Sequence, residues 1–377
     1  MVIPTPTQIM SEVPFLFFSV LALCLLSVYT ELAPDARRGR LLLGLIGASL
    51  AALYLRSIGI TLVAAVLLAL LARHDLRGAL IYAGGSFLGY APWLLRNLVH
   101  GTHGYLSQLL LQDPYLPQLG HASLSALFER PAVNVPAYLF EWFPFMLWPE
   151  TLLGADQILP ALLGAANLAV LVLFGVLEIR RRRMAPLLYL VFSFAVIAFW
   201  PPVWIDTRYL LPLLPVVGLA YAQVFEWIGA RLRRARRPRL RTALGALAAL
   251  GLLAFSASHV HQARGSVALG YHLPAYPPLY RLCEWTRRNL PADAVISVRK
   301  PFQCYLLAGR RTTQIMAQDS AKFLQALQSQ KVTHHLAARL GMTQEGTYYS
   351  VMQAYPSHFT LIRRVPEANL NLYQFHP

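Results

Sequence analysis

The chain has 377 residues, of which 56% are hydrophobic and only 13% are charged, and its mean hydropathy is +0.47. This composition is too apolar for an ordinary soluble domain and supplies repeated runs long enough to cross a bilayer, so it predicts a polytopic α-helical membrane protein. The formal net charge is +16, but the arginines cluster in short segments between apolar runs, as in loops that face anionic cytoplasmic lipid. The charge therefore argues for membrane topology and against nucleic-acid binding.

Apolar runs separated by basic or polar segments predict about eight transmembrane helices. The run over 41–71 is too long for a single crossing, and we expect it to fold back at residues 56–59, where Arg56 and Gly59 interrupt it. The expected spans are 13–29, the two arms of 41–71, 79–95, 159–177, 186–200, 210–228 and 244–255.

Four arginine clusters decide the predicted orientation. With these spans, all four clusters fall on one side of the membrane, which the positive-inside rule makes the cytoplasm. The N-terminus, a long outer loop over 96–156, the Asp206 loop and the C-terminal residues then fall outside. The four clusters are 37–40, 73–77, 180–183 and 231–241.

The composition turns polar after about residue 258, which divides the chain into a transmembrane domain (1–258) and a small extracytoplasmic α/β domain (259–377). The role of this α/β domain is to bind an acceptor or to cover a site in the membrane, and the alternative is structural support. Cys283 and Cys304 lie in it and can pair if it faces an oxidising compartment. The periodicity predicts helices over 279–289 and 320–328 and strands over 294–298, 332–336, 359–365 and 370–375.

Three arginines, Arg56, Arg96 and Arg208, map to the outer boundary, opposite the basic clusters. A guanidinium group presents a planar fork of donors to phosphate oxygens, so one interpretation is a clamp for a lipid phosphate. The other is that each side chain extends to the outer headgroups.

Other polar residues of the outer side have two interpretations each. His100 and His103 are spaced to share a metal with Asp113 if their segment is helical, whereas the neighbouring glycines favour a loop. Glu141 and Asp206 are the outer carboxylates that could act as a catalytic base or orient an acceptor, and the alternative for both is an ion pair.

The order of several short motifs resembles the GT-C superfamily of membrane glycosyltransferases. Within it, the chain is most similar to bacterial relatives of the protein mannosyltransferases and of the aminoarabinose transferase that modifies lipid A (glycosyltransferase 39-like). The motifs are MSEVPF (10–15), YLRSIG (54–59), PWLLRN (92–97), RYLLPLLP (208–215), EWTRRNLP (284–291) and YLLAGR (305–310).

This resemblance implies transfer of a sugar, with inversion, from a polyprenyl-phosphate carrier to an acceptor lipid, glycan or protein on the outer face. It implies a multi-pass protein of the bacterial cytoplasmic (inner) membrane, and the full-length family pattern allows a divalent metal. Arg56, Arg96 and Arg208 become the expected contacts of the carrier phosphate. Asn97 and Tyr209, within the same motifs, become expected substrate contacts.

One feature of that family has no counterpart here. Its catalytic acidic residue stands in the first outer loop after the first membrane helix, and nothing in this sequence matches it. The chain therefore resembles the C-terminal portion of a transferase, and we expect no transfer by these 377 residues alone. A non-catalytic polyprenyl-lipid binder or a transporter of envelope glycolipids is the alternative function, and an inert fragment is a third.

Overall fold

The computed structural model describes residues 11–32, 36–99, 105–114, 119–147, 158–236, part of 238–260, 276–315, 319–338, 345–366 and 369–377. The chain divides into two compact units, a helical unit, Met1–Ala263, and an α/β unit, Arg264–Pro377. This division falls a few residues after the boundary at 258 that the change in composition predicts.

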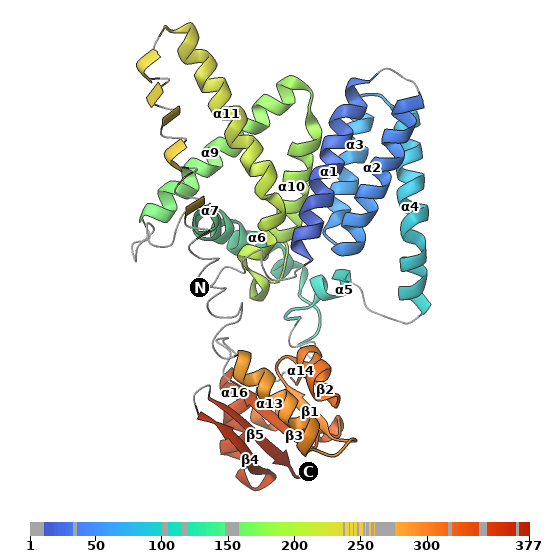
Figure 1. The fold of residues 1–377 in the computed structure, drawn as a ribbon, viewed down its shortest axis with the longest axis vertical. Helices are drawn as coiled ribbons and strands as arrows, with labels where there is room; N and C mark the ends of the chain where they lie inside the picture. The colour runs from blue at the N-terminus through green and yellow to red at the C-terminus, as the bar shows by residue number, and fades with distance from the viewer. Residues whose placement is uncertain are drawn as a thin grey trace. The chain divides into compact units, whose positions relative to one another are not determined.

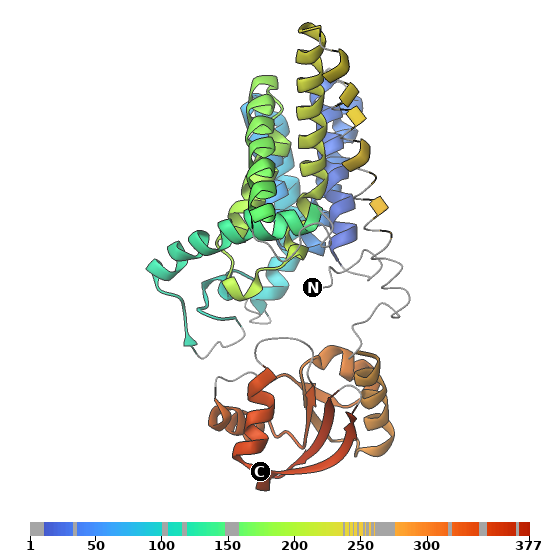
Figure 2. The same cartoon turned by 90° about the vertical axis from the view of Figure 1, so that its left-hand side faces the viewer.

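The helical unit is built from long helices that run up and down, joined by short turns (Figure 1). A second set of shorter helices, α6, η2 and α7, runs across one end of the long helices rather than along them (Figure 2). The elements are α1 (Glu12–Glu31), α2 (Ala36–Leu55), α3 (Gly59–Ala72), α4 (Leu76–Val99), α5 (Tyr105–Leu110), α6 (Leu124–Pro136), η2 (Ala137–Trp142), α7 (Phe143–Leu147), α9 (Ile158–Arg181), α10 (Met184–Ala198), η3 (Pro202–Trp204), η4 (Thr207–Tyr209), η5 (Leu211–Leu213) and α11 (Leu214–Arg234).

Within the described residues, four helical segments are long and apolar enough to cross a membrane: Glu12–Glu31, Arg37–Leu55, Ile158–Arg181 and Thr207–Arg234. Two further apolar helices, α3 and α10, are shorter, and α4 covers the span expected over 79–95 with 24 residues. The hairpin predicted within 41–71 is confirmed, since α2 ends at Leu55 and α3 begins at Gly59. The span expected over 244–255 lies in a stretch of which only some residues are described.

The basic clusters gather at one end of this bundle. Arg38, at the start of α2, contacts Asp75 in the turn between α3 and α4 at 2.6 Å, and Arg183 before α10 lies 3.8 Å from Glu31 at the end of α1. The C-terminal end of α11 lies at the same end (Figure 1). The expected grouping of the clusters on one side is therefore present in the fold.

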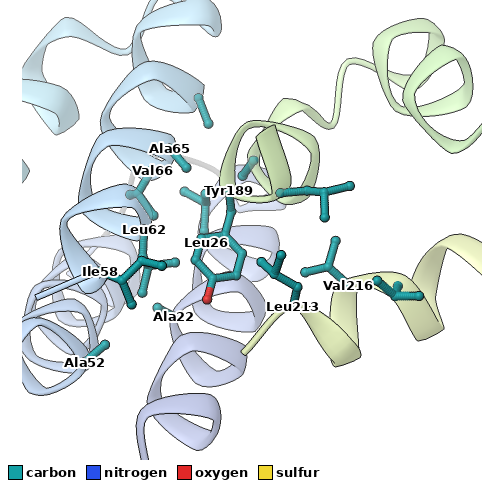
Figure 3. Packing of buried hydrophobic residues seen from close by; sticks show 14 of the residues in the cluster. Ala22, Leu26, Ala52, Ile58, Leu62, Ala65, Val66, Tyr189, Leu213 and Val216 are labelled. Carbon is teal, nitrogen blue, oxygen red and sulfur yellow. The ribbon is translucent and has the colours of Figure 1, made fainter. Parts of the chain in front are cut away.

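Small and apolar side chains hold the long helices together. Helix α1 carries no charge between its two terminal glutamates and buries a stripe with spacings of four and three residues, which keeps one face against its neighbours. Tyr189 of α10 lies among Leu26 of α1, Leu62 of α3 and Leu213 of η5 (Figure 3). The buried residues of this stripe are Phe15, Ser19, Ala22, Leu26 and Tyr29.

Two glycines allow α4 to approach α2 closely. A Cβ atom at Gly85 would lie 2.9 Å from Ile46 Cδ1, and one at Gly89 would collide with Leu50. Their spacing of four residues puts both on one face of α4, as in other membrane helix pairs that pack through small residues. Gly85 and Gly89 are therefore packing positions between α4 and α2.

The α/β unit contains a five-stranded mixed sheet in the order β2-β1-β3-β5-β4. Strand β1 pairs in parallel with β2 and β3, whereas β5 pairs antiparallel with β3 and β4. The strands are β1 (Val295–Val298), β2 (Arg311–Thr313), β3 (His334–Ala338), β4 (Phe359–Val365) and β5 (Leu370–Phe375).

Helices cover both faces of this sheet. Helices α13 (Tyr276–Asn289) and α14 (Pro301–Ala308) share one core with Ile296, while α15 (Ser320–Ser329) and α16 (Glu345–Ala354) share the other with Val295. Adjacent strand residues point to opposite faces, which explains the two cores. A disulfide between Cys283 and Cys304, with Cα atoms 5.3 Å apart, joins α13 to α14.

The sequence pattern missed part of this unit. The expected helices and strands are present, β4 and β5 with the predicted bounds and the others with bounds shifted by one to three residues, but α14, β2 and α16 were not predicted. Strand β2 has only three residues, which is too short for an alternating pattern to emerge.

Candidate functional site

A cavity of about 400 Å³ lies at the end of the helical unit opposite the basic clusters. Helix α1 begins at this cavity and reaches the basic end 20 residues later, a length of about 30 Å at 1.5 Å per residue. The turn between α2 and α3 and the 3-10 segments that precede α11 complete the wall. The lining residues are Ser11, Glu12, Leu55, Arg56, Ser57, Ile58, Gln108, Trp200, Trp204, Arg208, Tyr209 and Pro212.

Arg56 is held in this wall by Glu12. The tight turn after α2 places Arg56 at the cavity, and it requires glycine at position 59, where a Cβ atom would lie 2.7 Å from the backbone of Leu53. The Arg56 guanidinium forms an ion pair with the Glu12 carboxylate in the first turn of α1. The two side chains are 17% and 10% exposed, so the pair is largely removed from solvent.

Arg208 is positioned by Asp206. The Asp206 carboxylate caps η4 by accepting a hydrogen bond from the backbone N–H of Arg208 at 3.0 Å, and its second oxygen lies 3.6 Å from Arg208 Nε. Arg208 Nη2 donates to the Tyr209 hydroxyl at 2.9 Å. The side chains of Arg208 and Asp206 are 38% and 39% exposed, so this pair is open to solvent.

Tyr209 brings the two arginines together. Cζ of Arg208 lies 4.9 Å from the centroid of the Tyr209 ring, and Cζ of Arg56 lies 5.7 Å from the same centroid. Cations at these distances are attracted by the ring face. Two guanidinium groups from distant parts of the sequence therefore meet at one ring in the cavity wall.

An aromatic wall continues from Tyr209. The ring centroid of Trp200 lies 5.6 Å from that of Tyr209 and 5.7 Å from that of Trp204. The Trp200 side chain is nearly buried, and its indole N–H has no acceptor among the described residues. A buried donor of this kind gains free energy when a ligand or water supplies an acceptor.

Two buried residues of α6 fix this wall in place. Asn134 Nδ2 donates to the carbonyl oxygens of Ala198 at 2.8 Å and Trp200 at 2.7 Å, and so satisfies acceptors at the C-terminal end of α10. Arg130 donates to the carbonyl oxygens of Leu109 at 2.5 Å and Leu111 at 2.6 Å. Helix α6, within the predicted outer loop, thus ties the Trp200 segment to residues next to Gln108.

Only two of the three arginines expected to bind phosphate line the cavity. Arg56 and Arg208 line the cavity, as does Tyr209, an expected substrate contact. Arg96 does not line the cavity; it is exposed in the last turn of α4, with Cζ 4.9 Å from the centroid of the Trp93 ring. Asn97 follows Arg96 on α4 and is likewise not among the lining residues.

The two expected outer carboxylates differ in position. Asp206 borders the cavity through its contacts with Arg208, which is the ion pair that formed the alternative interpretation. Glu141 is exposed in η2 and does not line the cavity.

The expected metal ligands fall mostly outside the described residues. His100 and His103 both lie in the undescribed stretch before α5, while Asp113 is described and half-buried. In the ranges that are described, no group of three or more His, Cys, Asp or Glu side chains is placed to hold a metal.

Sequence reasoning missed Glu12 and Trp200. Glu12 carried a usable signal, since it is an acidic residue at the end of a long apolar run and Arg56 stands between the ends of two others. Opposite charges at the same membrane depth are expected to pair, because an unpaired charge there is costly.

Comparison with known proteins assigns the chain to no family. No model of a known protein family matches the chain, and no curated protein sequence matches it either. The structure itself defines the class: a helical unit with helices long and apolar enough to cross a membrane, and an α/β unit. The function is inferred from the residues of the cavity.

Proposed function

We propose that this chain is part of an integral membrane glycosyltransferase that binds a sugar linked to a polyprenyl phosphate and serves transfer to an acceptor on the outer face. The observation that carries the proposal is the convergence of Arg56 and Arg208 on one aromatic-walled cavity at the end of the bundle opposite the basic clusters. A phosphate at the outer face needs cations to bind it. The positive-inside rule explains arginines on the cytoplasmic side but not arginines at this end of the bundle.

The orientation in this proposal rests on two independent features. The basic clusters lie at one end of the bundle and are assigned to the cytoplasm, so the cavity opens toward the outer face. The Cys283–Cys304 disulfide supports an oxidising compartment for the α/β unit, since disulfides are rare in the cytosol. Both features agree with a bacterial inner membrane protein whose α/β unit is outside.

Each part of the cavity has a role in this proposal. Arg56 and Arg208 donate charge-assisted hydrogen bonds to the carrier phosphate. The rings of Trp200, Trp204 and Tyr209 offer apolar faces to the sugar, and the Trp200 indole N–H donates to one of its oxygens. The resemblance to the GT-C superfamily supplies the identity of the carrier.

A non-catalytic carrier binder is the second candidate, favoured by one specific observation. Both carboxylates at the cavity, Glu12 and Asp206, are engaged with arginines. A carboxylate in that state positions a cation rather than accepting the proton of an acceptor hydroxyl. In this version the chain binds the carrier without turning it over.

Carrier binding is tested with the purified chain in lipid nanodiscs and a short-chain polyprenyl monophosphate, with the dissociation constant measured by native mass spectrometry. A charge-assisted hydrogen bond contributes about 1.5 to 3 kcal/mol, so Arg208→Ala should weaken binding roughly ten- to a hundredfold. Arg96→Ala is the matched control and should bind within about twofold of the unmodified chain.

Two results would oppose the proposal: unchanged binding by Arg208→Ala, or an equal loss in Arg96→Ala. Release of sugar from a polyprenyl-phosphate sugar in the presence of an acceptor would support the transferase and exclude the non-catalytic carrier binder. These 377 residues alone are expected not to transfer the sugar, so absence of turnover fits both candidates. The coding sequence immediately upstream then separates them: an in-frame stretch encoding apolar helices around an acidic loop supports the transferase, and a stop codon with a promoter supports the carrier binder.

A further inference from the structure

Helix α14 of the α/β unit exposes an apolar face. Phe302 is 85% exposed, Leu306 is 78% exposed and Tyr305 is 56% exposed. Their spacing of three and four residues puts them on one side of the helix, while Cys304 and Ala308 are buried on the other. Three large side chains so exposed on one short helix mark a contact surface rather than scattered surface residues.

This face is fixed rigidly to the unit. The disulfide from Cys304 to Cys283 fastens the buried side of α14 to α13. Thr312 of the edge strand β2 donates to the Pro301 carbonyl oxygen at 2.8 Å and ties the start of the helix to the sheet. The apolar side chains are therefore presented by a fixed platform, which lowers the entropy lost on docking.

The segment that carries α14 is basic. The segment from α13 to β2 contains seven Lys and Arg residues against two acidic ones, Glu284 and Asp293. Arg310 follows α14 and donates to the carbonyl oxygens of Arg287 at 2.9 Å and Leu290 at 3.0 Å, which draws the exposed Arg287 to the end of the helix. The seven are Arg281, Arg287, Arg288, Arg299, Lys300, Arg310 and Arg311.

From this combination we propose that α14 docks on the surface of an anionic phospholipid bilayer. Phe302 and Leu306 enter the boundary between headgroups and acyl chains, Tyr305 lies at headgroup depth, and exposed cations of the same segment, Arg287, Arg288 and Arg311, face the lipid phosphates. Aromatic and apolar residues flanked by cations are the pattern of helices that lie in a membrane interface.

A bilayer is within reach of the unit. Helix α13 begins 16 residues after Val260, the last described helical residue of the helical unit, a separation that can span at most about 55 Å. Charge complementarity favours lipid over a second copy of the chain, because two copies would bring like-charged basic segments together. This inference does not depend on the function proposed for the cavity.

The test uses the full chain reconstituted in vesicles of zwitterionic and anionic phospholipid that carry a photoreactive diazirine on the acyl chain. After irradiation, lipid adducts are mapped by mass spectrometry. We expect adducts on the peptide that contains α14 and none on the peptide that contains α15, which covers the opposite face of the sheet. We expect Phe302→Ser with Leu306→Ser to lower the α14 adduct yield at least tenfold, because both large apolar contacts are removed.

The matched control replaces exposed apolar residues elsewhere on the same unit. Leu361→Ser with Ile362→Ser alters β4, where the side chains are 50% and 38% exposed, and should leave the α14 yield within twofold. An unchanged urea unfolding midpoint of the α/β unit shows that a variant is folded. Absence of adducts on α14 in the unmodified chain, or an equal adduct yield on the peptides of α14 and α15, would overturn the proposal.

Discussion

The ion pair between Glu12 and Arg56 gives the sharpest test of how the cavity is built. Replacement of Arg56 by Met removes the cation but keeps most of the side-chain volume, so the Glu12 carboxylate is left without its partner. Replacement of Glu12 by Gln in the same chain then removes the unpaired charge. The two single variants and the double variant complete a mutant cycle.

The expected loss in free energy of unfolding follows from the burial of the Glu12–Arg56 pair. Exposed ion pairs contribute about 0 to 1 kcal/mol, whereas removing one partner of a buried pair costs about 3 to 5 kcal/mol. With side chains only 17% and 10% exposed, the Glu12–Arg56 pair lies close to the buried limit, so Arg56→Met should cost about 3 kcal/mol. The double variant should recover most of that loss, with a coupling energy of about 1 to 3 kcal/mol.

The assay is thermal unfolding of the purified chain in detergent, followed by tryptophan fluorescence. A loss of 3 kcal/mol should lower the unfolding midpoint by roughly 6 to 12 °C, at about 2 to 4 °C per kcal/mol for a unit of this size. If the effects of Arg56→Met and Glu12→Gln simply add in the double variant, the two side chains are not coupled and the described geometry is wrong.

Three other expectations concern particular residues. Asn134→Leu should destabilise the helical unit by about 2 kcal/mol in the same thermal assay, because the carbonyl oxygens at the end of α10 lose their donor. Replacing both Cys283 and Cys304 by Ser should destabilise the α/β unit by about 3 kcal/mol in urea, since the bond closes a loop with a sequence separation of 21. Burial lowers the pKa of His334 below its ordinary value of 6.5, so the unfolded state binds the proton more readily, and stability of the α/β unit should fall as the pH drops through 6.5 toward the lower folded pKa.

Each of these has its own control. Glu129→Gln, an exposed change on α6, should leave the midpoint unchanged, and an equal effect of Asn134→Leu and Glu129→Gln would contradict the capping role. The serine pair is compared with the reduced unmodified chain, which should unfold at the same urea concentration. His334→Gln should flatten the pH dependence, and a slope that survives this change would assign it to other groups.

Long apolar runs and charge clusters were the parts of the fold that could be predicted from the sequence. The break between α2 and α3 was predictable because Arg56 and Gly59 interrupt a run too long for one crossing. Strand β5 was predictable from its alternating pattern, whereas α14 was not, because its exposed face is as apolar as its buried one. Local periodicity carries no information when both faces of a helix are apolar.

The site could be predicted only in part. Arg56 and Arg208 were candidates because each maps to the predicted outer boundary of the membrane, and the fold brings both to Tyr209. Arg96 met the same criterion but does not line the cavity, since membrane depth does not specify position around the bundle. Glu12 was missed because its pairing with Arg56 depends on the packing of α1 against the α2–α3 turn. The two residues are 44 positions apart in the sequence, so local patterns do not reveal the contact.

The most direct measurement for the proposed function is an experimental structure of the chain in nanodiscs with a polyprenyl monophosphate bound. The account predicts that the phosphate lies within hydrogen-bond distance of the guanidinium groups of both Arg56 and Arg208, with the Trp200 indole beside it. A phosphate bound at Arg96, or at the basic end of the bundle, would contradict the account.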